Sequence, residues 1–181
     1  MYLYPEFNYE NTVKNLISPL IFLLVLAGCK NETPAPEFEA LTIDEVSELK
    51  CNPEEENCAY ISVNIPWVKN SGSRNKTLNR NIENHVLSLI DYQEENSYQS
   101  LENLSQRFID DYENSVREFP EFNIPWEASV EGRILQNTSH LISMEFNLAL
   151  FTGGAHGYTS KSFLNIDPET GEILYNEDLF T

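Results

Sequence analysis

Residues 126–151, WEASVEGRILQNTSHLISMEFNLALF, carry the clearest structural pattern of the chain. Up to residue 134, with a glycine at 132, and again from residue 142, apolar side chains recur at every second position, so each half has one apolar and one polar face. The four polar residues 136–139 separate the halves and suit a turn. The segment therefore predicts a β-hairpin whose core-facing residues are Trp126, Ala128, Val130, Ile134, Ile142, Met144, Phe146, Leu148 and Leu150.

Further strands are expected on both sides of this hairpin. Residues 59–65 alternate in the same way and predict a strand that stops at Pro66. Residues 38–43 fit a first strand, but residues 42–46 also fit the capped start of a short helix, and both interpretations stay open. Residues 160–166 predict a third strand after the hairpin; the Pro and Gly of residues 167–171 then suit a turn, and residues 172–175 a return strand.

Two segments between residues 76 and 118 have helical spacing. In residues 76–94 and 98–118 apolar side chains recur every three or four positions, which is typical of amphipathic helices. Their acidic faces suit contact with water better than a cation site, since no tight Gly-containing loop gathers the acids. The predicted fold class is α+β, an antiparallel β-sheet with two amphipathic helices packed on one face. The apolar positions are Leu78, Ile82, Val86, Leu89 and Ile90, then Leu101, Leu104, Phe108, Ile109, Tyr112 and Val116.

The composition limits the kinds of partner. The chain has 181 residues and a formal charge of −18, so it lacks the basic face that a general nucleic-acid binder needs. At 41% apolar and 12% aromatic residues, it has material for one core.

The first 37 residues predict an address at the cell envelope. Residues 16–27, LISPLIFLLVLA, have the length of a signal-peptide core, and Leu26-Ala27-Gly28-Cys29 resembles the lipobox of bacterial lipoproteins. We expect residues 1–28 to be a signal peptide, with 1–12 a mis-annotated start because they carry acids and no Lys or Arg. Cys29 is then lipidated, the membrane is reached through this lipid anchor, and residues 29–37 form a tether.

Two further cysteines, Cys51 and Cys58, stand in CNPEEENC. An exported compartment permits oxidation, and the Asn-Pro turn can bring the sulfur atoms together, so we expect a disulfide that staples a hairpin. A metal site is the weaker interpretation, because no His lies within 25 residues and zinc needs four ligands.

An ordered series of motifs closes the chain. Phe151-Thr152-Gly153-Gly154-Ala155-His156-Gly157 is followed by FLNID at 163–167, TGEIL at 170–174 and EDLF at 177–180. Over about residues 58–181 the chain resembles a bacterial envelope family. This family includes the N-terminal domain of the peptidoglycan deacetylase PdaC and the extracytoplasmic part of the anti-sigma factor RsiV. The resemblance implies an α+β domain at 38–157 and, at 158–181, the start of a truncated second domain.

The Gly-Gly-Ala-His motif has two interpretations. Gly153, Gly154, Ala155 and His156 are a candidate binding motif, or a turn that leads from a strand into a loop. We favour the turn, and we expect Gly154 to be the position that a Cβ would strain.

No motif predicts catalysis. His85, His140 and His156 lack a metal-binding spacing, no Gly-x-Ser-x-Gly is present, and we expect no metal and no cofactor. The predicted function is a non-catalytic envelope lipoprotein that binds peptidoglycan or a cationic envelope protein such as lysozyme, for which the acidic surface provides attraction. The alternative is a cryptic cell-wall hydrolase or a deacetylase-associated enzyme.

Overall fold

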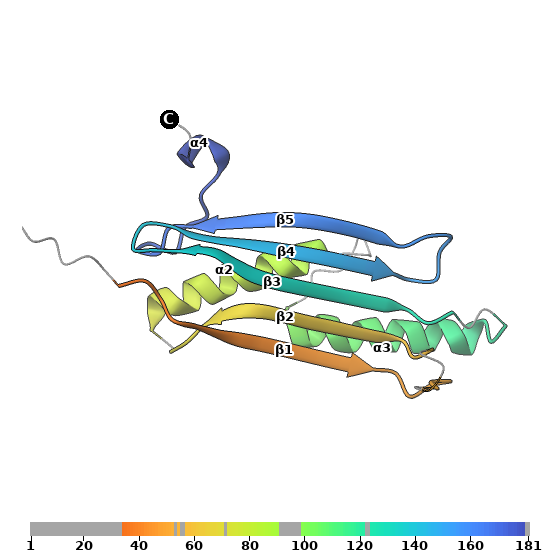
Figure 1. The fold of residues 1–181 in the computed structure, drawn as a ribbon. Coiled ribbons are helices and arrows are strands. Elements are labelled where there is room, and N and C mark those ends of the chain that lie inside the picture. Colours follow the sequence, from red (N-terminus) through yellow and green to blue (C-terminus); the bar gives the residue numbers. More distant parts are fainter. Residues whose placement is uncertain are drawn as a thin grey trace, which may run out of the picture. The chain divides into compact units, whose positions relative to one another are not determined.

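A computed structural model describes residues 34–52, 54, 57–70, 72–90, 99–121 and 124–179. Five strands follow one another across a single sheet in chain order, and two helices lie together on one of its faces (Figure 1). This arrangement confirms the α+β class. The strands are β1 (Phe38–Val46), β2 (Tyr60–Val68), β3 (Glu127–Asn137), β4 (Ile142–Phe151) and β5 (Tyr158–Ile166), and the helices are α2 (Ser73–Leu89), α3 (Leu101–Glu118) and the single turn α4 (Asn176–Leu179).

The sheet is antiparallel except at its centre. The hairpins β1–β2, β3–β4 and β4–β5 are antiparallel, whereas β2 and β3 run parallel over residues 60–64 and 127–131. The prediction of an antiparallel sheet is corrected at this one pair. The reason is topological: both long helices lie between β2 and β3 in the chain, and such a crossover returns the chain to the same end of the sheet.

The core lies between the sheet and the two helices. The apolar stripes of α2 and α3 meet the inward-facing residues of the central strands, as the two sequence periods predicted. The predicted core positions Ala128, Val130, Ile142, Met144 and Phe146 are all 0% exposed. The hairpin at 126–151 is therefore confirmed in its pairing and in the face it buries.

Strand β2 does not stop at Pro66 but continues to Val68. Beyond Asn64, β2 is no longer paired with β3, so the missing N–H of proline interrupts no bond of that ladder. Gly132 of β3 faces the proline ring, and a Cβ built there would lie 2.9 Å from Pro66 Cδ. Glycine at 132 thus makes room for a proline inside the sheet.

Of the two interpretations of the segment before the cysteines, the strand is confirmed. Residues 38–46 pair with 60–68 along their whole length, so the short helix is excluded.

The helices begin or end within a few residues of the predicted bounds. Ser100 caps α3, because its Oγ accepts a hydrogen bond from the Asn103 N–H at 3.1 Å.

The end of the predicted tether packs against the sheet domain. Pro36 is buried, its carbonyl accepts a hydrogen bond from Asn137 Nδ2 at 2.9 Å, and the Glu37 carbonyl accepts one from the Lys69 N–H. The spacer expected over 29–37 is therefore shorter at its C-terminal end. Residues 1–33, including the predicted signal peptide and Cys29, lie outside the described residues.

The segment predicted to start a second domain at residue 158 adds a strand to the same sheet. Strand β5 pairs with β4 from Tyr158 to Ile166, and Leu164 and Ile166 are 2% and 0% exposed in the same core as the other strands. Within residues 34–179 there is no break between 157 and 158. Strand β5 extends the sheet on the side of β4 that β3 does not occupy, and its apolar residues continue the hydrophobic face of β4.

The chain after β5 folds back on that strand. Asp167 caps the predicted turn, since its Oδ1 accepts hydrogen bonds from the N–H groups of Glu169 and Thr170. The predicted return strand at 172–175 is reduced to one bridge between Ile166 and Ile173, after which α4 begins at Asn176. In the described part of the chain, no helix has the length and apolarity that crossing a membrane would require.

Candidate functional site

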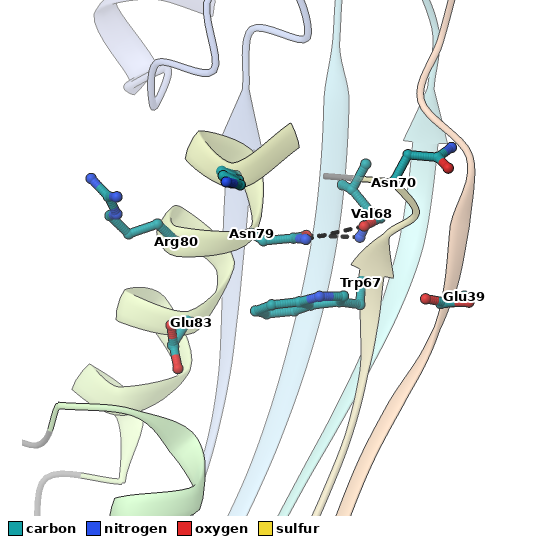
Figure 2. Close-up of a pocket in the computed structure, with 8 residues that line it drawn as sticks. Glu39, Trp67, Val68, Asn70, Asn79, Arg80 and Glu83 are labelled. Atoms are coloured by element: carbon teal, nitrogen blue, oxygen red, sulfur yellow. Dashed lines mark hydrogen bonds between the residues drawn. The ribbon is translucent and has the colours of Figure 1, made fainter. Parts of the chain in front are cut away.

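A groove of about 590 Å³ lies between α2 and the end of the β1–β2 hairpin (Figure 2). Figure 2 shows Trp67 reaching from β2 toward α2, beneath Asn79, while Glu39 lies across on β1. We call this surface the Trp67 groove; its lining is Glu39, Trp67, Val68, Asn70, Lys76, Asn79, Arg80 and Glu83.

Asn79 fixes the two walls of the Trp67 groove to each other. Its side-chain Oδ1 accepts a hydrogen bond from the Val68 N–H at 2.8 Å, and its Nδ2 donates to the Val68 carbonyl at 3.0 Å. The amide thus serves as a strand neighbour for the last residue of β2. Because both bonds hold α2 against the strand, the groove is largely formed before any ligand arrives.

The rim of the Trp67 groove carries charges of both signs. The side chains of Glu39, Lys76 and Arg80 have no hydrogen bond or ion pair within the described residues. One oxygen of Glu83, Oε1, accepts a hydrogen bond from the Leu101 N–H at 3.2 Å. In Figure 2 the Arg80 guanidinium is turned outward from Trp67, so this cation stands at the outer rim. The groove therefore offers an indole surface with cations and carboxylates beside it.

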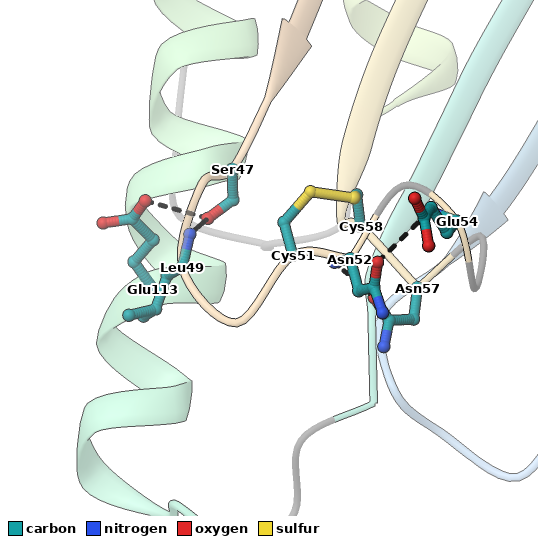
Figure 3. Close-up of a disulfide and its surroundings, with 8 residues drawn as sticks. All are labelled: Ser47, Leu49, Cys51, Asn52, Glu54, Asn57, Cys58 and Glu113. Atoms are coloured by element: carbon teal, nitrogen blue, oxygen red, sulfur yellow. Dashed lines mark hydrogen bonds between the residues drawn. A yellow bond between two sulfur atoms is a disulfide. The ribbon is translucent and has the colours of Figure 1, made fainter.

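The disulfide predicted from the sequence is confirmed. Cys51 and Cys58 are bonded, with their Cα atoms 4.4 Å apart, in the connection between β1 and β2 (Figure 3). The Asn52 N–H also donates to Asn57 Oδ1 at 2.6 Å, so the loop is tied twice. Nearby, Ser47 Oγ donates to Glu113 Oε1 at 2.9 Å and links this loop to α3. The pair acts as a staple of the hairpin, as expected.

The Gly-Gly-Ala-His motif forms the exposed turn between β4 and β5. Gly153 has φ +81°, and a Cβ there would lie 3.2 Å from Trp126 Nε1. Gly154 has no such φ, and a Cβ on it would meet nothing within 4 Å. Strain was expected at Gly154, but the structure places the need for glycine at Gly153. Ala155 and His156 are exposed.

The three histidines lie in separate places. His85 is on α2, His140 precedes β4 and His156 is in the β4–β5 turn. His85 Nε2 lies 3.0 Å from Ser162 Oγ, its ring packs 5.0 Å from that of Phe146, and burial lowers its pKa below 6.5. Across the described ranges, no three His, Cys, Asp or Glu side chains gather in a way that could hold a metal ion.

A charge cluster lies on the sheet face away from the helices. Glu145 on β4 is the centre: its Oε1 lies 3.0 Å from Arg133 Nη2 and 3.0 Å from Lys161 Nζ. Asn147 Nδ2 donates to the same oxygen at 3.2 Å. The hydrogen bonds from Arg133, and after them those from Lys161, lower the pKa of Glu145 to about 2. The four polar side chains satisfy one another, which points to a structural role.

The residues of the Trp67 groove were not singled out from the sequence. Lys76, Arg80 and Glu83 do have a signal, because positions i, i+4 and i+7 share one side of a helix. Polar residues at that spacing are also what any solvated helix face shows, so the pattern alone could not indicate a site. The other wall, on β1 and β2, becomes adjacent only in the folded chain.

The fold and the family follow from comparison with known proteins. The family model described as deacetylase PdaC matches residues 53–159, which is more than half of the chain. The protein belongs to this family, and the resemblance inferred from the motif series is confirmed. A search of curated proteins finds no match.

Two solved structures share the fold. One is a DUF3298 family protein from Pseudomonas aeruginosa PAO1, 20% identical, with a TM-score of 0.61 over 81% of this chain and 58% of that one. The other is a DUF3298 family member from Bacteroides fragilis, 17% identical, with a TM-score of 0.61 over 82% of this chain and 62% of that one. The chain thus spans about three fifths of the length of these structures, and at this identity the likeness concerns the fold alone.

Proposed function

We propose that the protein is a non-catalytic binding module of the cell envelope, held at the membrane by a lipid on Cys29, and that its Trp67 groove binds peptidoglycan. The observation that carries the proposal is the set of unpaired charges of both signs around an indole. Ligand sites commonly combine an aromatic surface with a few polar groups that fix orientation.

The chemistry of peptidoglycan suits such a groove. A wall fragment combines sugar rings, whose C–H faces pack on an indole, with peptide stems that carry carboxylates and amines. Lys76 and Arg80 are cations that a stem carboxylate can pair with, and Glu39 and Glu83 are carboxylates for an amine. Because the charges lie at an open rim, each pair adds little affinity by itself, and the indole contact supplies most of the binding.

The formal charge of −18 favours a second candidate, a cationic envelope protein such as lysozyme. An acidic surface of this size accelerates the encounter with a basic partner, and the effect falls as salt is added. The third candidate is a cryptic hydrolase or deacetylase-associated enzyme, which the release of soluble wall fragments would reveal.

Binding to isolated peptidoglycan tests the proposed site. The full chain, kept in detergent, is sedimented with purified sacculi, and the bound fraction is compared between wild type, Lys76→Gln and Arg80→Gln. Arg107→Gln is the matched control, since it removes one exposed cation from α3, away from the Trp67 groove. We expect each groove variant to bind roughly threefold more weakly and the control to bind like the wild type.

The outcomes separate the candidates. Wild-type binding that is equal in all three variants contradicts the groove as the site. Absent binding to sacculi, with binding to lysozyme that weakens steeply between low and high salt, favours the cationic partner. Release of soluble fragments from labelled sacculi reveals an enzyme.

The proposed anchor has its own test. Labelled palmitate fed to the producing cells should enter the wild-type protein and not Cys29→Ala. Equal labelling of the two proteins contradicts lipidation at Cys29, whatever the result for the Trp67 groove.

A further inference from the structure

A second pocket, of about 570 Å³, lies on the other side of α2. Its walls are α2, the end of β5 and the segment that folds back after β5. We call it the Asn-rich pocket, after its main lining residues Asn84, His85, Phe163, Asn165, Tyr175 and Asn176. It shares no lining residue with the Trp67 groove, although α2 contributes to both.

Two amide side chains of the Asn-rich pocket are available to a ligand. Asn84 and Asn176 line it from α2 and from the start of α4, and their side chains have no hydrogen-bond partner within the described residues. Asn165 borders the pocket from β5, but its side chain is on the same sheet face as Glu145. Each amide offers two N–H donors and one carbonyl acceptor. A hydroxyl group is both a donor and an acceptor, so neighbouring amides match a ligand that is rich in hydroxyl groups.

One aromatic side chain of the pocket lining offers an exposed ring. Tyr175, in the segment before α4, is 62% exposed. Phe163 borders the pocket from β5, but it lies opposite Glu145 in the β4–β5 register, so its ring is on the other face of the sheet. Exposed large apolar side chains close to a pocket with convergent polar groups favour a binding surface. The flat C–H face of a sugar ring packs on such a ring, which removes apolar surface of both partners from water.

The walls of the pocket are held in place without a ligand. The Leu174 N–H donates to the Asn165 carbonyl at 2.8 Å, and Asn81 Nδ2 donates to the Gly171 carbonyl at 2.6 Å. The first bond joins the returning segment to β5, and the second joins it to α2. At the base, His85 Nε2 lies 3.0 Å from Ser162 Oγ. These contacts reduce the conformational cost of binding.

The charge of the lining distinguishes the two sites. Glu177 is the one carboxylate among the residues that line the Asn-rich pocket, and no Lys or Arg lines it. The Trp67 groove carries two cations and two carboxylates. A ligand of the Asn-rich pocket is therefore expected to be uncharged.

From these observations we infer that the Asn-rich pocket binds an uncharged oligosaccharide through the Asn84 and Asn176 amides and the Tyr175 ring. This site is independent of the proposed Trp67 groove, so failure of one proposal leaves the other to its own test.

Calorimetric titration with two neutral sugars, chitotetraose and maltotetraose, tests the inference. The full chain is kept in a zwitterionic detergent, because a sugar headgroup would compete. We expect at least one sugar to bind, and Tyr175→Ala and Asn84→Ala each to weaken that binding about three- to tenfold. The matched controls are Tyr158→Ala, an exposed ring at the far end of β5, and Asn103→Ala, an exposed amide on α3. Both should bind like the wild type.

Three results would overturn the inference: no binding of either sugar at millimolar concentration, equal binding by all variants, or equal losses in variants and controls. Thermal melting of each variant shows that a loss of binding is not a loss of folding. Binding that Arg80→Gln weakens but Tyr175→Ala does not would assign the sugar to the Trp67 groove, and it would also overturn the inference.

Discussion

Arg133 and Glu145 stand directly opposite each other in the β3–β4 register, and Arg133 Nε and Nη2 each lie 3.0 Å from Glu145 Oε1. Lys161, from the neighbouring strand β5, reaches the same oxygen at 3.0 Å. One carboxylate thus joins three strands on the sheet face that the helices leave uncovered. Only 7% of the Glu145 side chain is exposed, because its partners cover it.

Glu145 should make the stability of the protein depend on pH in the acidic range. Its pKa in the folded protein is about 2 against an ordinary 4.5, so its stabilising effect is fully present above about pH 4.5 and is lost as the pH falls through about 2. We expect Glu145→Gln to lower the free energy of unfolding at neutral pH, and the difference from wild type to shrink between pH 4.5 and pH 2. Urea unfolding at a series of pH values measures it. A difference that stays constant over this range would contradict the argument.

His85 should also make the stability of the protein depend on pH, in a higher range than Glu145. Burial lowers the pKa of His85 below 6.5, so the unfolded chain takes up a proton before the folded protein does. The free energy of unfolding is therefore expected to fall as the pH drops below about 6.5, and His85→Phe should remove that part of the pH dependence. An NMR titration of the His85 ring gives the pKa directly. A midpoint at or above 6.5 would show that the ring is not buried as described.

Gly153 and Gly154 should differ sharply although they are adjacent. Gly153→Ala adds a Cβ to a residue whose φ is +81° and directs it toward Trp126. We expect this change to lower the free energy of unfolding by roughly 1–3 kcal/mol. Gly154→Ala is the matched control, since its Cβ would meet nothing within 4 Å, and its melting temperature should stay close to the wild-type value. Equal melting temperatures for the two variants would contradict the turn geometry.

Loss of the Cys51–Cys58 disulfide should lower stability by about 2.5 kcal/mol, the loop-closure entropy for so short a loop. The double variant Cys51→Ser and Cys58→Ser is compared with wild type in urea unfolding. Alkylation of the wild-type protein before and after reduction serves as the control, and both thiols should react only after reduction. A double variant as stable as the wild type would mean that Asn52 and Asn57 already fix the loop.

Much of the fold could be predicted because sequence period is a local property. Alternation over residues 126–151 required a hairpin, and three- and four-residue spacing from Leu78 to Val116 required helices, whatever surrounds them. The Cys51–Cys58 pair could also be expected, since seven positions along the chain keep the two sulfur atoms within reach.

Other features depended on contacts between distant segments. Pro66 looked like the end of a strand because its N–H is missing, but Gly132 on β3 provides space for the ring and the strand continues. Residues 158–166 looked like the start of another domain, yet β4 needed a neighbour on its outer side and β5 pairs with it.

The sequence by itself determined the types of the two long helices and of the strands β2 to β5, the sides that they bury, the disulfide and the family. The tertiary structure alone decided the parallel pairing of β2 and β3 and both candidate sites. The Trp67 groove needs Glu39 from β1 across from Arg80 of α2, and the Asn-rich pocket needs Asn84 of α2 together with Tyr175 from the segment after β5. Local periodicity predicts which side of a helix or strand faces the core. A site made of polar residues on the outer sides forms only when packing brings those sides together.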